Sequence, residues 1–159
     1  MVILVDYTPL ISEKNEIFKH LWETHRLDSL NGSHDYIEAA MFGYAAGMAI
    51  ESFWNYNLSP REKVIAHFHE WMTGVGVLYL DLNVPQISTL FTTHATVVGR
   101  ALAEKGYPLY QKLHEFNGDS MAREFNIPAR QSLEKTAAQT ADSFTTVSDI
   151  TARECKQLL

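Results

Sequence analysis

Two histidines and a glutamate stand close together in the segment His-Phe-His-Glu-Trp, residues 67–71. Imidazoles and carboxylates are common ligands of zinc and iron, so this segment is the first candidate for chemistry. If the segment is helical, successive residues are turned by about 100°, and His67 and His69 project to nearly opposite sides. His67 and Glu70 are three residues apart, so they lie on neighbouring rows and can each supply one ligand.

A third ligand has to come from another segment, because catalytic zinc usually takes three ligands from the protein. His94 is the best candidate, since it falls on an apolar helical face where an imidazole needs a partner. The sequence therefore offers a metal site of His67, Glu70 and His94, or a haem site in which His94 binds the iron. The structural alternative is a core histidine that is hydrogen-bonded to a backbone carbonyl or to Thr92 or Thr93.

Other catalytic patterns are missing from the sequence. It contains no G-x-S-x-G, no phosphate-binding P-loop and no G-x-G-x-x-G segment. The lone Cys155 cannot form an internal disulfide, and it cannot build a cysteine-based zinc site. Because no catalytic constellation emerges, the sequence favours a protein that is not an enzyme, and we predict no cofactor.

Composition restricts the partners that the chain can bind. The 159 residues are 46% hydrophobic and 20% charged, which is typical of a folded globular domain, and the formal net charge is −6. The acidic residues concentrate in the first 57 positions, where Lys14, Lys19 and Arg26 are outnumbered by Asp6, Glu13, Glu16, Glu23, Asp28, Asp35, Glu38 and Glu51. Such a surface disfavours nucleic acid and anionic lipid, and it can attract a basic protein.

The sequence shows no targeting or membrane-spanning segment. The N-terminal stretch MVILVDYTP has no basic residue, and its apolar run is too short for the core of a signal peptide. The longest apolar stretches are well short of the roughly 20 residues that cross a bilayer. We therefore expect a soluble cytoplasmic protein with no membrane partner.

Helical spacing dominates the pattern of apolar residues. Caps, glycines and prolines divide the chain into segments, with Thr8-Pro9 opening the first helix, Ser33 the second and Pro60 preceding the third. Helices are expected over roughly 9–31, 33–57, 61–83, 85–106, 108–116 and 128–158. A competing interpretation places a short buried strand at residues 75–80, between Gly74 and the next turn.

Gly43 and Gly47 lie four residues apart inside the second predicted helix. A glycine lowers helix stability by about 1 kcal/mol relative to alanine, so some contact should compensate. A groove without side chains allows another backbone to approach closely. We therefore expect a helix, from this chain or from a partner, to pack here.

The C-terminal segment differs from the rest, since Phe144 is the only aromatic residue after position 125. Its apolar seam is rich in threonine and alanine, so an isolated helix of about 30 residues would be marginal in water. The helix is expected to pack on the bundle or on a partner, which makes this segment a candidate interaction surface.

Together these features predict an all-α fold, a compact bundle of about five or six helices with a long C-terminal helix. We expect an aromatic-rich bundle over residues 1–118, followed by a turn and the polar helix over 119–159. The predicted function is protein binding or homodimer formation without catalysis, as an inhibitor or adaptor that acts through its acidic surface or its C-terminal helix. The alternative is a bundle that binds a small molecule, haem or metal through His67, Glu70 and His94. Candidate partner-binding residues are Gly43, Gly47, Leu133, Phe144 and Val147.

Overall fold

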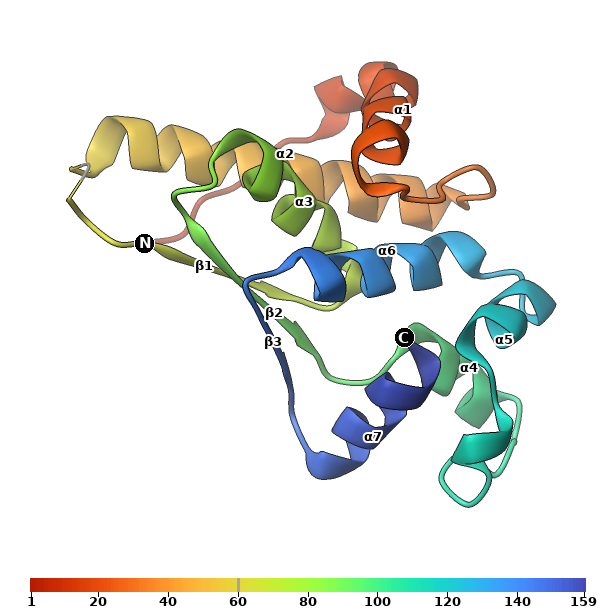
Figure 1. Ribbon diagram of the computed structural model, residues 1–159. Coiled ribbons are helices and arrows are strands. Elements are labelled where there is room, and N and C mark those ends of the chain that lie inside the picture. The colour runs from red at the N-terminus through yellow and green to blue at the C-terminus, as the bar shows by residue number, and fades with distance from the viewer. Residues whose placement is uncertain (60) are drawn as a thin grey trace.

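The computed structural model describes residues 1–59 and 61–159. Within these ranges the fold is mixed α/β, with a three-stranded parallel sheet and seven α-helices (Figure 1). The strands are β1 (Ile65–His69), β2 (Ser88–Thr93) and β3 (Ser143–Thr146). The helices are α1 (Lys14–His25), α2 (His34–Asn57), α3 (Gly74–Asn83), α4 (Val97–Glu104), α5 (Gly118–Glu124), α6 (Pro128–Thr140) and α7 (Asp149–Leu158). Short 3₁₀ helices cover Thr8–Glu13, Trp71–Thr73 and Leu113–Glu115.

The all-α prediction was wrong, because three segments that were expected to be helical are strands. Residues 65–69 alternate exposed and buried positions along β1, which is the period of a strand with one covered face. The predicted helix over 85–106 divides into β2, a turn and α4, while the long C-terminal helix divides into α6, β3 and α7. The competing strand at 75–80 was also wrong, since α3 occupies those residues. The predicted break at Pro60 lies outside the described residues.

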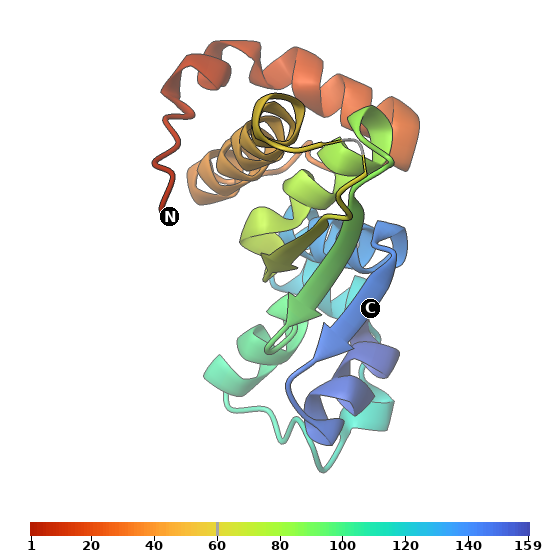
Figure 2. The ribbon, with the colours of Figure 1, turned by 90° about the vertical axis from the view of Figure 1, so that its left-hand side faces the viewer.

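The sheet has the order β1-β2-β3, and every neighbouring pair is parallel. Its register places Phe68 beside Phe91 and Phe91 beside Phe144, so one row of aromatic side chains crosses all three strands. This row belongs to a core cluster with residues of α3 and α6, including Leu80 and Ala137. The three strands therefore share one covered face, and their carboxyl ends point toward the same end of the molecule (Figure 2).

Helices α1 and α2 form a layer at the opposite end, beside α3 (Figure 2). Gly43 and Gly47 are both buried on α2 and face α3. A Cβ atom at Gly47 would lie 2.7 Å from Cδ1 of Tyr79, and one at Gly43 would lie 3.3 Å from Cβ of Val75. The groove that these glycines leave on α2 is therefore filled by a helix of the same chain.

The C-terminal half ends in a third core cluster, built by α4, α5 and α7 around Val98, Leu102, Ala122 and Leu158. Helix α7 follows β3 and turns back toward α4 (Figure 1). The predicted division of the chain at residue 118 stays a prediction. Across residues 1–59 and 61–159, no helix combines the length and apolar character that crossing a membrane requires.

Candidate functional site

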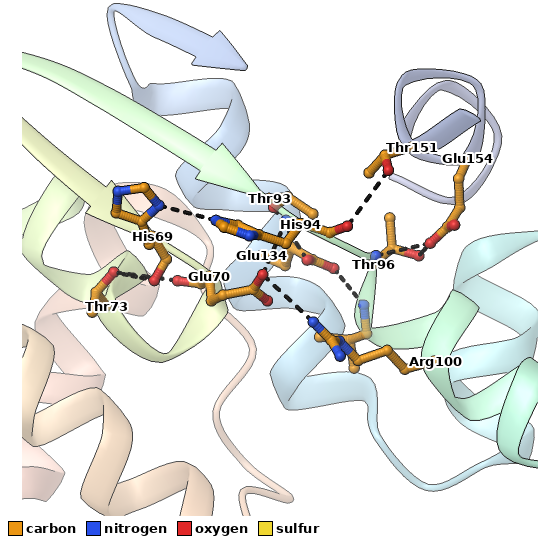
Figure 3. A network of polar contacts seen from close by, with 11 residues as sticks. His69, Glu70, Thr73, Thr93, His94, Thr96, Arg100, Glu134, Thr151 and Glu154 are labelled. Atoms are coloured by element: carbon orange, nitrogen blue, oxygen red, sulfur yellow. Dashed lines mark hydrogen bonds and ion pairs between the residues drawn. The ribbon is translucent and has the colours of Figure 1, made fainter. Parts of the chain in front are cut away.

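The carboxyl ends of β1 and β2 bring together residues that are distant in the sequence. In open parallel sheets ligands bind outside these ends, because the connecting turns present side chains and free backbone groups there. Strand β1 ends at His69, so Glu70 follows directly, and β2 ends at Thr93, so His94 follows directly. Figure 3 shows both residues at this edge of the sheet, with Arg100 extending toward them from α4.

Three histidines line the exposed side of this edge. On a strand, residues two apart share a face, and the rings of His67 and His69 lie with centroids 4.1 Å apart. Nδ1 of His69 is 3.1 Å from Nε2 of His94, so the two rings share a hydrogen bond whose donor depends on the tautomers. His67 instead shares a hydrogen bond of 2.7 Å with the hydroxyl of Thr92. The separation of His67 from His69 that a helix would impose does not exist here.

The pKa of His69 is lowered. Partial removal from water is the main cause, and the neighbouring His67 and His94 add to it because a second positive charge beside them is unfavourable. His69 is therefore predominantly neutral near neutral pH, so one of its ring nitrogens can accept a proton while the other donates.

Glu70 connects the two strand ends. Its carboxylate accepts a hydrogen bond of 2.9 Å from the backbone N–H of His94 and lies 3.6 Å from the guanidinium of Arg100. Its backbone has φ 65° and ψ 159°, a region that is almost confined to glycine. A non-glycine residue there stores about 1–3 kcal/mol of strain, and such strain concentrates at functional positions.

Two buried carboxylates lie behind the turn that carries His94. Glu134 of α6 accepts a hydrogen bond from the backbone N–H of Val97, and Glu154 of α7 accepts one from that of Thr96. Both glutamates are almost completely inaccessible to solvent. Burial raises the pKa of Glu134 to about 8, with Glu70 and Glu154 adding to the shift while the hydrogen bond from Val97 opposes it.

The structure therefore gathers a polar cluster that the sequence revealed only in part. His67, Glu70 and His94 all lie near this edge. His69 was set aside because a helix would turn it away from His67, and Arg100, Glu134 and Glu154 were not among the candidates. One signal in the sequence could have revealed this site. Residues 65–70 and 88–96 each contain a short run of β-branched or alternating residues, typical of a strand, that is followed directly by a polar turn. Within residues 1–59 and 61–159, the group of three or more potential metal ligands that lie close enough to share an ion is His34, Asp35 and Glu38, at the start of α2.

The predicted partner-binding residues are spread over different environments. Gly43, Gly47 and Leu133 are buried within the chain, whereas Phe144 is half-buried on β3 and stacks on Phe91. Val147 is exposed after β3. These residues do not lie on one helical face, and a role in partner binding stays a prediction.

Comparison with known proteins identifies the kind of chain that carries this site. A family model described as Glycogen synthase matches residues 1–159. Proteins named glycogen [starch] synthase from Dictyostelium discoideum, Neurospora crassa and Caenorhabditis elegans are each 36% identical to it over 158 residues, which is 99% of the chain. The chain spans only 17%, 22% and 24% of their respective lengths.

This match overturns the function predicted from the sequence. Neither a non-enzymatic protein-binding bundle nor a haem-binding or metal-binding bundle agrees with a whole-chain match to synthases and a parallel α/β sheet. The metal-binding and haem-binding alternative depended on assigning helix to residues that form β1 and β2, and the protein-binding prediction depended largely on one long helix where the chain forms α6, β3 and α7. The chain belongs to the glycogen synthase family.

Proposed function

We propose that this chain supplies part of the active site of a glycosyltransferase that adds glucosyl units to glycogen or starch. The observation that carries the proposal is the match of the entire chain to proteins named glycogen [starch] synthase. The polar cluster at the carboxyl ends of β1 and β2 supports it, since this edge is where parallel α/β sheets bind ligands.

The chemistry of glucosyl transfer accounts for the residue types. The bond from the sugar C1 to the leaving-group oxygen breaks, and a bond from C1 to a glucan hydroxyl oxygen forms, with loss of the hydroxyl proton. A good leaving group at neutral pH is an anionic phosphate, as in a nucleoside diphosphate glucose. Arg100 supplies the positive charge that stabilises such a group, and the imidazole rings of the histidine cluster can form hydrogen bonds with sugar hydroxyls.

We propose separate tasks for the residues of the site. His94 and Arg100 are exposed and available to a ligand, whereas Glu70 is mostly buried and holds both through its carboxylate. We assign His94 and Arg100 to substrate contact and Glu70 to their positioning. His69 orients the ring of His94 through the 3.1 Å contact between their nitrogens.

The test measures transfer of glucose from a nucleoside diphosphate glucose to glycogen by the complete protein that carries this chain. His94→Ala and Arg100→Ala should each lower kcat/KM by at least about 100-fold, which is the effect of removing a group that contacts the reacting centre. His114→Ala and Arg123→Ala replace exposed residues of the same types and should change it by less than about twofold. Absence of transfer by the unmodified protein, or full activity of both site variants, would refute the proposal.

A further inference from the structure

The turn between β2 and α4 is held by side chains from three other segments. The backbone N–H of His94 donates to Glu70, that of Thr96 to Glu154 (2.8 Å) and that of Val97 to Glu134 (2.9 Å). The N–H of Gly99 donates to the hydroxyl of Thr96, which caps the helix. The first N–H groups of a helix have no partner within the helix, so side chains here satisfy groups that would otherwise be free to bind a ligand.

Glu154 makes the tightest of these contacts. Its Oε1 accepts from both the backbone N–H and the hydroxyl of Thr96, the latter at 2.6 Å (Figure 3). A Cβ atom at Gly99 would lie 2.1 Å from this oxygen, so the glycine leaves the space that the carboxylate occupies. Its other oxygen lies 3.5 Å from the hydroxyl of Tyr110. Thr151, one helical turn before Glu154, donates to the carbonyl of His94.

Glu134 completes the arrangement from α6. Its Oε2 accepts from the N–H of Val97 and its Oε1 from the hydroxyl of Thr93, the last residue of β2. The two glutamates thereby hold the Thr93 side chain before His94 and the backbone after it, which includes the start of the helix that carries Arg100. Both glutamates act from the interior of the protein, because they are buried while His94 and Arg100 are exposed.

We infer that Glu134 and Glu154 are positioning residues, which orient His94 and Arg100 through the backbone of residues 93–97 and exclude a ligand phosphate from the N-terminus of α4. The inference rests on the proposed function in that it assigns the oriented residues to a transferase site. Carboxyl oxygens accept from the N–H groups of Thr96 and Val97, and the Thr96 hydroxyl accepts from that of Gly99, at a helix start of the kind that many parallel α/β proteins offer to phosphate. On this inference the anionic leaving group is held by side chains such as Arg100 instead.

Two measurements on the complete protein test the inference. Amide hydrogen exchange reports the order of the turn without any assay of activity. Glu154→Ala should speed exchange of the Thr96 amide by about 10- to 100-fold, and Glu134→Ala should do the same at Val97. Gly99→Ala displaces the Glu154 carboxylate without removing it, so it should also speed exchange of the Thr96 amide. The matched control is Asp119→Asn, which alters an exposed carboxylate that binds Lys135 and does not touch the turn.

Kinetics then separate positioning from general stability. A loosened turn should lower kcat by about 10- to 100-fold with KM for the sugar donor changed by less than about threefold. Glu154→Gln keeps an oxygen that accepts from the Thr96 N–H, so it should recover most of kcat and of the exchange protection. If Glu154→Ala does not fold, Glu154→Gln and Gly99→Ala still test the inference.

Unchanged exchange at Thr96 and Val97 in the alanine variants and in Gly99→Ala would overturn the inference. So would a loss of activity that only follows the folded fraction. If the unmodified protein transfers no glucose, the proposed function fails, while the exchange rates still decide whether the glutamates fix the turn.

Discussion

At the scale of single residues, the buried carboxyl of Glu134 makes stability depend on pH. Its pKa is raised from an ordinary 4.5 to about 8, first because it is buried and then because Glu70 and Glu154 lie nearby. Between these values the folded protein keeps the proton that the unfolded chain has lost. The contribution of Glu134 to stability is therefore greatest below pH 4.5 and is lost as the pH rises through 8.

Glu134→Gln should remove this dependence. Urea unfolding at about pH 5 and about pH 9 should show that the variant gains stability relative to the unmodified protein at the higher pH. Asp119→Asn is the control, because Lys135 lowers the pKa of Asp119 and its contribution is lost only as the pH falls. If the free energy of unfolding changed equally with pH in the unmodified protein and in Glu134→Gln, the expectation would be contradicted.

At the scale of elements, the packing of α2 on α3 distinguishes two glycines that look alike in the sequence. A methyl group at Gly47 would overlap Cβ and Cγ of Tyr79, atoms that are close to the backbone and cannot move freely. At Gly43 the nearest atoms lie at 3.3 and 3.4 Å. Overpacking costs about 1–3 kcal/mol, whereas alanine gains about 1 kcal/mol of helix propensity over glycine.

Gly47→Ala should therefore lower the free energy of unfolding by up to about 2 kcal/mol, and Gly43→Ala should leave it nearly unchanged. Thermal and urea unfolding of both variants measure the difference. The displaced Tyr79 should also lose its hydrogen bond to Glu51. A Gly47→Ala variant as stable as Gly43→Ala would show that α3 moves away without cost.

Some helix starts could be predicted from the sequence, but strands could not. Helix α2 begins after Ser33 and α6 begins at Pro128, as the local residues indicate. Helix α5, which the side chain of Asn117 caps, was expected to be a turn. Strands β1, β2 and β3 are short, and their apolar residues also fit a spacing of three and four. Pairing between strands decides the outcome, and their partners are distant in sequence, as Phe91 and Phe144 show.

The error at the site followed from the same ambiguity. His67 and His69 point apart on a helix and together on a strand, so the choice of element decided which histidine approaches His94. Glu134 and Glu154 lie on buried faces of their helices. The residues next to them in the sequence do not indicate which groups they contact. Only the fold places the N–H groups of Thr96 and Val97 beside them.

At the scale of the whole molecule, the chain has three buried apolar clusters, but its site is open. Small-molecule sites usually bury about 70–90% of a ligand, and they exclude water when the bound group is reactive. His94 and Arg100 are both exposed, with no described segment of the chain shielding them. The relatives that match are about four to six times as long as this chain, and the additional length can supply a covering surface.

The 159-residue chain alone is therefore expected to fold without transferring glucose. Circular dichroism should show mixed helix and strand with cooperative melting, and histidine signals in NMR should shift only weakly with a nucleoside diphosphate glucose, at a Kd of about 1 mM or above. Full-length glycogen synthase of C. elegans, assayed beside it, provides the positive control for transfer to glycogen. Transfer by the isolated chain at a comparable rate would show that the exposed edge suffices, and that no further surface has to close over His94 and Arg100.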